Sequence, residues 1–197
     1  MLNSLVQTAL KLLSPGVPDI YQGTELWDLS LVDPDNRRPV SFAERAALLD
    51  EIAAVAALPS ERLPTAVDRL REAWPDGRIK LYLLRRLLAL RREMPQLFTG
   101  GDYRPLAVEG GQAERVCAFQ RARNGRRVIV VVGRHFAALT APAATLPAPA
   151  AWQDTSVAVA ENGSAALRDI LTGRFTGEKA AIPISELFVN LPVAVLV

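Results

Sequence analysis

Cysteine and histidine are almost absent from this chain, because Cys117 and His135 are the only residues of their kinds among 197. A single cysteine excludes a disulfide within the chain and is typical of a reducing compartment, so we expect a cytoplasmic location. One histidine and one cysteine are too few for a zinc site, and no metal is expected. The sequence also has no glycine-rich phosphate-binding loop between a strand and a helix, and no cofactor is expected.

Long apolar runs and a strong excess of one charge are missing as well. No run reaches the roughly 18 apolar residues of a membrane span, and the first residues lack the basic start of a signal peptide. The net charge is +2, which is too weak to indicate a nucleic-acid-binding protein. We therefore expect neither a membrane nor a nucleic acid as a partner. With 50% hydrophobic and 22% charged residues, the chain has the composition of a globular protein.

Helical patterns dominate the first half of the chain. Apolar residues at helical spacing, or alanine-rich and leucine-rich runs, predict helices at residues 2–13, 42–57, 59–73 and 78–92. Ser41 is the expected N-cap of the second helix. The last of these helices is rich in arginine, and burial of its leucines with arginines at the margins is a simpler interpretation than a nucleic-acid or membrane surface.

Two segments connect the first and second helices. Residues 17–21 are apolar enough to predict a short buried strand, although Pro18 weakens that prediction. Residues 22–40 predict a long polar loop, and loops of this length in compact domains are usually functional or disordered.

Short strands separated by turns are predicted after Phe98. Asn124-Gly125 lies between the runs 116–121 and 127–132, which is the strongest hairpin signal in the chain. Further strands are predicted at 152–160, 166–171, 180–184 and 191–197. These strands predict an antiparallel β-sandwich. The fold class expected for the whole chain is therefore α+β, with one unit at 1–97 and a second at 98–197.

The loop before residue 40 concentrates groups that bind polar ligands. Its carboxylates, guanidinium groups and aromatic rings are Asp19, Glu25, Asp28, Asp33, Asp35, Arg37, Arg38, Tyr21 and Trp27. Sugars need such a mixture, because their hydroxyls form hydrogen bonds and their C–H faces pack on aromatic rings. A structural loop whose arginines pair with its own carboxylates is the alternative interpretation, and the composition leaves both open.

The same residues resemble a known family. The pattern Gly-x-Pro-x-x-Tyr-x-Gly-x-Glu, typical of the eighth barrel strand and following loop of α-amylase-type glycoside enzymes, is matched by Gly16, Pro18, Tyr21, Gly23 and Glu25. The continuation at 26–40, Leu-Trp-Asp-Leu-Ser-Leu-Val-Asp-Pro-Asp-Asn-Arg-Arg-Pro-Val, is more specific and resembles the maltooligosyltrehalose synthase family. Looser similarity continues at 76–80, 85–92, 98–103 and 169–173.

The resemblance implies a fold and a function. It implies the last strand and helices of a (β/α)8 barrel followed by a C-terminal β-sandwich. The family is an isomerase of trehalose biosynthesis, a (1->4)-alpha-D-glucan 1-alpha-D-glucosylmutase. It converts the reducing-end α-1,4 linkage of a maltooligosaccharide into an α,α-1,1 linkage by intramolecular transglycosylation, without a cofactor.

The family's catalytic aspartates and glutamate lie on earlier barrel strands, and no carboxylate of this chain matches them. We therefore expect a fragment of a longer enzyme that is inactive alone and has no catalytic residue of its own. Because barrel enzymes place their sites at the C-terminal ends of strands, the loop is expected to face the substrate cleft. The expected substrate-binding residues are Tyr21, Gln22, Glu25, Asp33, Asp35, Asn36, Arg37 and Arg38.

Two other functions remain open at this stage. One is a carbohydrate-binding module in which the β-sandwich holds the sugar. The other is a structural or assembly module that self-associates, because a barrel strand and helices without their neighbours would expose apolar surface.

Overall fold

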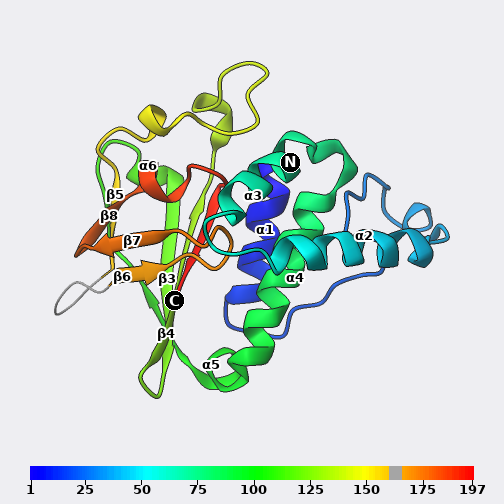
Figure 1. Ribbon diagram of the computed structural model, residues 1–197, viewed down its shortest axis with the longest axis horizontal. Helices are drawn as coiled ribbons and strands as arrows, with labels where there is room; N and C mark the ends of the chain where they lie inside the picture. Colours follow the sequence, from blue (N-terminus) through cyan, green and yellow to red (C-terminus); the bar gives the residue numbers. More distant parts are fainter. Residues whose placement is uncertain (160–165) are drawn as a thin grey trace.

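The computed structural model describes residues 1–159 and 166–197 (Figure 1). The longer helices are α1 (Leu2–Leu13), α2 (Phe42–Ala56), α3 (Leu63–Glu72) and α4 (Arg78–Glu93), with short α5 (Pro95–Gly100) and α6 (Ile184–Leu187). The strands are β1 (Asp102–Pro105), β2 (Val108–Glu109), β3 (Val116–Arg123), β4 (Arg126–Gly133), β5 (Ser156–Ala158), β6 (Ala166–Arg168), β7 (Phe175–Glu178), β8 (Ala181–Pro183) and β9 (Val193–Leu196). Helices precede antiparallel strands, so the chain has the predicted α+β class.

The helices form where local signals predict them. Helix α1 spans residues 2–13 as expected, and α2 begins after Ser41, whose hydroxyl accepts a hydrogen bond from the Glu44 amide at 3.3 Å. Pro64 lies in the first turn of α3, where its missing N–H has no helical partner to lose. Helix α3 therefore begins at Leu63 rather than at residue 59.

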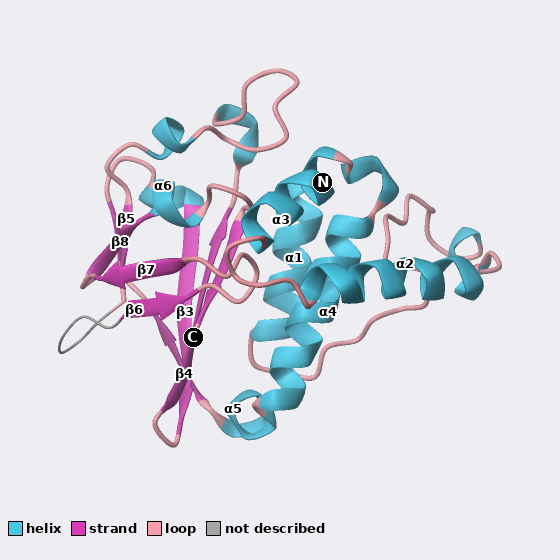
Figure 2. Cartoon of the chain, in the orientation of Figure 1, coloured by secondary structure: helices cyan, strands magenta, loops and turns pink. Residues whose placement is uncertain are grey.

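Strand β4 lies at the centre of the core. Antiparallel pairing gives the order β1-β3-β4-β9, and β4 residues Val128 to Val132 are each 0–1% exposed. Because successive side chains point to opposite faces, both faces of this sheet are covered. Helices α1 and α4 lie on one side, and β5, β8 and α6 lie on the other (Figure 2).

The smaller sheets extend this core. Strands β2, β5 and β8 form one antiparallel sheet, and β6 and β7 form another among the described residues. The predicted hairpin is confirmed, with β3 and β4 joined at Asn124-Gly125. The strand expected at 152–160 is shorter than predicted, because residues 149–152 form a 3-10 turn that buries Trp152, and residue 160 lies outside the described residues.

The strand predicted at residues 17–21 is wrong. These residues form no strand in the described structure, and Val17 is 97% exposed. A strand needs a neighbour to accept its backbone hydrogen bonds, and none of the described strands lies beside this segment. Pro18 removes one donor in addition.

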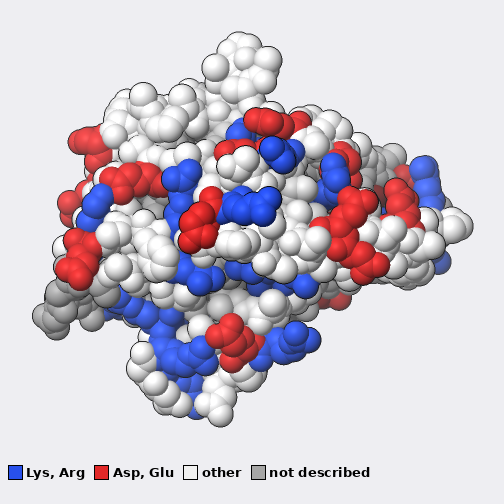
Figure 3. All heavy atoms as spheres, in the orientation of Figure 1, with Lys and Arg blue, Asp and Glu red and all other residues white. Residues whose placement is uncertain are grey.

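The arginines of α4 lie at the margins of the core, as predicted. Arg86 donates its Nε to the Ile170 carbonyl at 3.0 Å, and Arg91 donates to the Leu12 carbonyl at 2.5 Å. Basic and acidic side chains are interspersed over the face drawn in Figure 3. Arginine in this helix therefore joins it to neighbouring elements through backbone carbonyls.

Tyr82 of α4 provides a pH-dependent link to the strands. Its ring is 0% exposed and its hydroxyl donates to the Leu171 carbonyl at 2.6 Å. Burial raises the pKa of Tyr82 from 10.0 to about 12. The folded state therefore keeps this proton at a pH where the unfolded chain loses it.

The stability contributed by the Tyr82 proton is present below pH 10 and is lost as the pH rises to about 12. Two pKa units correspond to about 2–3 kcal/mol of unfolding free energy. In urea unfolding, the stability advantage of the wild type over Tyr82→Phe should shrink by about this amount between pH 9.5 and pH 12. Parallel pH profiles for the two proteins would contradict the assignment.

Candidate functional site

The segment that connects α1 to α2 borders a surface cavity of about 370 Å³. Its lining includes Gln22, Asp35, Asn36 and Arg38, which are four of the eight predicted binding residues. The other four, Tyr21, Glu25, Asp33 and Arg37, do not line it. The structure thus places four of the eight predicted substrate-binding residues, from both ends of the loop, around one cavity.

Glu25 anchors the loop to α2. Its carboxylate accepts hydrogen bonds from the Gly23 amide at 2.9 Å and from Arg45 Nε at 3.1 Å. Arg45 also donates from Nη2 to the Gly23 carbonyl at 3.1 Å. This charged network holds the start of the loop against α2.

Lys80 of α4 provides a second anchor. Its Nζ donates to the Leu26 carbonyl at 2.9 Å and lies 5.7 Å from the centre of the Trp27 ring. Trp27 donates its Nε1 to the Trp74 carbonyl at 2.5 Å. Burial, reinforced by nearby Lys11, lowers the pKa of Lys80 below its usual value. The Trp27 ring is therefore held in place beside the cavity by α4 and the turn before it.

The paired arginines of the loop are exposed rather than buried. Arg37 pairs with Asp33 and Arg38 pairs with Asp35, and the two arginine side chains are 71% and 75% exposed. Asp35 also accepts a hydrogen bond from the Leu31 amide at 2.8 Å. Pairing of arginines with carboxylates of the same loop is one of the two interpretations that the composition left open.

Asn36 differs from its neighbours. Asn36 lines the cavity, and its Oδ1 atom is buried and has no hydrogen-bond partner among the residues that the structure describes. Buried polar atoms nearly always have a partner, so an unpaired one in a cavity indicates a place where a ligand hydroxyl or amide is expected.

Residues outside the predicted set complete the cavity. Trp27, Asp28 and Ser30 lie in the polar loop, and Arg45 lies on α2. Asp28 accepts hydrogen bonds from the Ser30 amide at 2.9 Å and hydroxyl at 2.6 Å, which lower the pKa of its carboxyl. Composition marked Trp27 and Asp28 as sugar-compatible groups, but no local signal marked Arg45, which sits in an alanine-rich helix.

Tyr21 lies at a separate small cavity of about 220 Å³, which Lys11, Asp19 and Lys80 also line. The phenol is 45% exposed. Among residues 1–159 and 166–197, no group of three histidine, cysteine or acidic residues is arranged to hold a metal ion. None of the described helices is both long and apolar enough to span a membrane.

Comparison with known proteins shows what this chain is similar to. No family model matches the chain. A protein of Mycobacterium tuberculosis (strain CDC 1551 / Oshkosh), described as a maltooligosyl trehalose synthase, is 37% identical over 195 residues, or 99% of this chain. The solved maltooligosyltrehalose synthase of Arthrobacter ramosus covers all of this chain at 40% identity, with a TM-score of 0.70. The chain is homologous to a C-terminal part of maltooligosyl trehalose synthase.

The match covers only part of these synthases. The chain spans 20% of the Mycobacterium tuberculosis protein and 22% of the Arthrobacter ramosus chain. An Anoxybacillus α-amylase, 18% identical with a TM-score of 0.56 over 98% of this chain, shares the fold alone. The resemblance of residues 14–40 to the synthase family is thus confirmed, together with its wider relation in fold to α-amylases.

Proposed function

We propose that the cavity beside residues 22–40 binds a maltooligosaccharide and forms one wall of the substrate cleft of a maltooligosyl trehalose synthase. The observation that carries the proposal is a cavity lined by Trp27, Arg38 and Asn36, whose buried Oδ1 has no hydrogen-bond partner among the described residues. An amide oxygen accepts a sugar hydroxyl, the guanidinium donates to others, and the indole packs on a C–H face. The complete enzyme would convert the reducing-end α-1,4 linkage into an α,α-1,1 linkage.

The carboxylates of the loop are suited to binding rather than to bond cleavage. Retaining glycoside chemistry needs a nucleophilic carboxylate and an acid/base carboxyl about 5–5.5 Å apart, both free to react with the sugar. Glu25 and Asp35 are engaged by arginines, and Asp28 is engaged by Ser30. We therefore propose that this chain alone has no trehalose-forming activity and contributes its loop to a reaction carried out by other carboxylates.

Titration with maltopentaose, followed by tryptophan fluorescence, tests the binding. We expect a saturating change that disappears in Trp27→Phe. Asn36→Ala should weaken binding roughly tenfold, because a ligand hydroxyl loses its buried acceptor. Asn3→Ala, the same chemical change on the exposed surface of α1, is the matched control. A normal affinity in Asn36→Ala, or glucan-to-trehalose conversion by the purified chain, would overturn the proposal.

Exposed apolar side chains favour a second, assembly role for the same segment. Val17, Leu29, Leu31 and Val32 are 77–97% exposed, which is unusual for large apolar residues. Helix α1, in contrast, packs its apolar face against α4 and the main sheet. The apolar surface that we expected a barrel remnant to expose is therefore found in the loop but not on α1. We propose self-association through this loop, and strictly monomeric behaviour in sedimentation velocity would count against it.

We also propose the division into a helical unit at 1–97 and a β unit at 98–197, with the first derived from the end of a catalytic barrel and the second from a β-sandwich. Helices α1 and α5 pack on strands β4 and β3 across that boundary. We propose a cytoplasmic location as well, because a single cysteine is typical of a reducing compartment. Limited proteolysis near residue 97 that releases two stable pieces would support the division. A single cooperative unfolding transition of the whole chain in urea would oppose it.

A further inference from the structure

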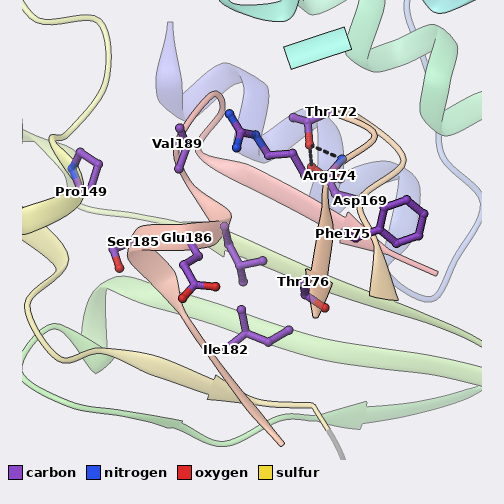
Figure 4. A pocket seen from close by; sticks show the side chains of 11 residues that line it. Pro149, Asp169, Thr172, Arg174, Phe175, Thr176, Ile182, Ser185, Glu186 and Val189 are labelled. Carbon is purple, nitrogen blue, oxygen red and sulfur yellow. Dashed lines mark hydrogen bonds between the residues drawn. The ribbon is translucent and has the colours of Figure 1, made fainter. Parts of the chain in front are cut away.

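A cavity larger than the loop cavity lies in the β unit. It has a volume of about 580 Å³ and lies between β7, β8 and α6 (Figure 4). The volume falls within the range of roughly 300–1,000 Å³ that is usual for small-molecule sites. It shares no lining residue with the cavity beside residues 22–40, so it is a separate feature of the molecule.

Arg174 supplies hydrogen-bond donors on one side of this cavity. Its Nε donates at 2.9 Å to the side-chain oxygen of Asn190, which is 1% exposed. Asn190 donates in turn to Asp68 of α3 at 2.8 Å. These contacts fix the guanidinium through Nε, and its two terminal amino groups have no hydrogen-bond partner in the described parts of the chain.

Glu186 and Ser185 of α6 supply acceptors on another side. The Glu186 carboxylate receives hydrogen bonds of 2.7 and 2.6 Å from Lys179, which holds its direction, and it remains 48% exposed. The Ser185 hydroxyl has no partner among the described residues and lies next to Glu186 in the cavity wall (Figure 4). Apolar surface between the polar groups comes from Ile182 and Val189.

The charges exclude most classes of ligand. An anion would meet the Glu186 carboxylate, whose charge Lys179 balances only in part because both side chains are partly exposed, and a cation would meet the Arg174 guanidinium in the same cavity. The Asp169 carboxylate also lines the cavity but is already occupied by the Thr172 hydroxyl at 2.6 Å and by two backbone amides. A wholly apolar ligand would leave the terminal amino groups of Arg174 desolvated without a partner.

We propose that this cavity is a second saccharide site, which binds a neutral sugar unit through hydroxyls paired between Arg174 and Glu186. A neutral polyhydroxyl ligand matches a donor group and an acceptor group that line the same cavity, with Ile182 and Val189 against its C–H surface. The site goes beyond the proposed cleft function, because it would hold a glucan away from the loop that binds the reacting end.

Amide NMR shifts of the full chain during titration with maltotriose test this site. Saturating shifts are expected in amides 174–177 and 185–189. Glu186→Gln should weaken the affinity measured there roughly tenfold while leaving the shifts of amides 22–40 unchanged. Glu178→Gln, which makes the same change on β7 outside the cavity, should have no effect. Ser185→Leu, which fills the cavity with a larger side chain, should abolish the shifts at 174–177.

The outcomes separate the two proposals. Shifts at 22–40 without shifts at 174–189 would overturn the second site and leave the cleft proposal standing. Shifts at 174–189 alone would support the second site and count against the cleft. Equal weakening by Glu186→Gln and Glu178→Gln, or shifts at 174–189 with inorganic phosphate but not with maltotriose, would also overturn the second site.

Discussion

Replacing Arg121 with methionine is expected to lower the free energy of unfolding by about 3–5 kcal/mol. Arg121 lies on β3 and is 2% exposed. Its guanidinium donates at 3.1–3.4 Å to five backbone carbonyls, those of Leu13, Leu97, Phe98, Gly101 and Asp102. Methionine fills a similar volume but leaves all five acceptors without this donor.

The effect is large because several of these carbonyls lie at helix ends, where the backbone has few other hydrogen-bond partners. Leu13 ends α1 and Phe98 lies in the last turn of α5, where carbonyls lack a helical N–H partner, whereas the Leu97 carbonyl also accepts a hydrogen bond from the Gly101 amide at 3.0 Å. A cation beside the negative end of a helix is favourable in addition. Burial, together with nearby Arg91, lowers the pKa of Arg121. One side chain therefore joins the helical half of the chain to the main sheet.

Arg123→Met is the matched control for Arg121→Met. Arg123 lies two residues further along β3, is exposed, and among the described residues donates only to the Gly100 carbonyl. Its replacement should change stability by less than about 0.5 kcal/mol. Urea unfolding of both variants, followed by circular dichroism, measures the difference. Similar midpoints for the two variants would show that Arg121 does not carry the role assigned to it.

Replacing Asp169 with alanine is expected to cost about 3–4 kcal/mol of stability at low pH. Asp169 is 4% exposed and follows β6. Its Oδ1 accepts from the amides of Leu171 at 3.0 Å and Val195 at 3.1 Å, and its Oδ2 accepts from the Thr172 hydroxyl. Alanine would leave two buried amides without an acceptor and remove the side-chain link between the turn at 169–174 and β9, although the Ile170 amide would still bond the Val195 carbonyl.

The cost should depend on pH. Burial raises the pKa of the Asp169 carboxyl above 3.8, although its hydrogen bonds act in the opposite direction. A raised folded-state pKa contributes stability that is present below pH 3.8 and is lost as the pH rises through the folded-state value. The stability difference between the wild type and Asp169→Ala should therefore be largest near pH 4 and shrink toward neutral pH.

Thr172→Ala is the control for Asp169→Ala, because it removes one hydrogen bond to the same carboxylate and keeps both amide contacts. About 1 kcal/mol is expected, because the Thr172 hydroxyl makes one short bond to Asp169 and one long contact of 3.4 Å with the Arg174 amide. Guanidinium unfolding at several pH values between 4 and 7 measures both variants. A Thr172→Ala loss as large as that of Asp169→Ala, or a difference that grows with pH, would contradict the role of Asp169.

Local sequence signals predicted much of the fold. The extent of α1, the Ser41 cap of α2 and the Asn124-Gly125 hairpin follow from periodicity, capping and turn chemistry, which act between residues close in sequence. The strand at 17–21 was predicted from its apolar residues, but a strand depends on a distant neighbour. Without such a neighbour, this segment is a connection between α1 and the polar loop rather than a strand.

The sequence predicted which segment carries the candidate site, but not how the side chains of that segment are arranged in space. Residues 22–40 carried the sugar-compatible groups, yet sequence could not distinguish Asn36, whose Oδ1 is unpaired, from Asp33, which pairs with Arg37. Arg45 and Lys80, which anchor the loop, lie 20 and 54 residues from their partners Glu25 and Leu26. No local pattern predicts such pairs, because they form only when α2 and α4 pack beside the loop.

The amino-acid sequence alone determined the α+β class, the main helices, the hairpin and the relation to maltooligosyl trehalose synthase, because each depends on neighbouring residues or on an uninterrupted motif. Only the tertiary structure decided which loop residues share a cavity, that Arg121 holds two helix ends to the sheet, and that Arg174 and Glu186 both line a second cavity. Those features join residues that are distant along the chain, and packing brings them together.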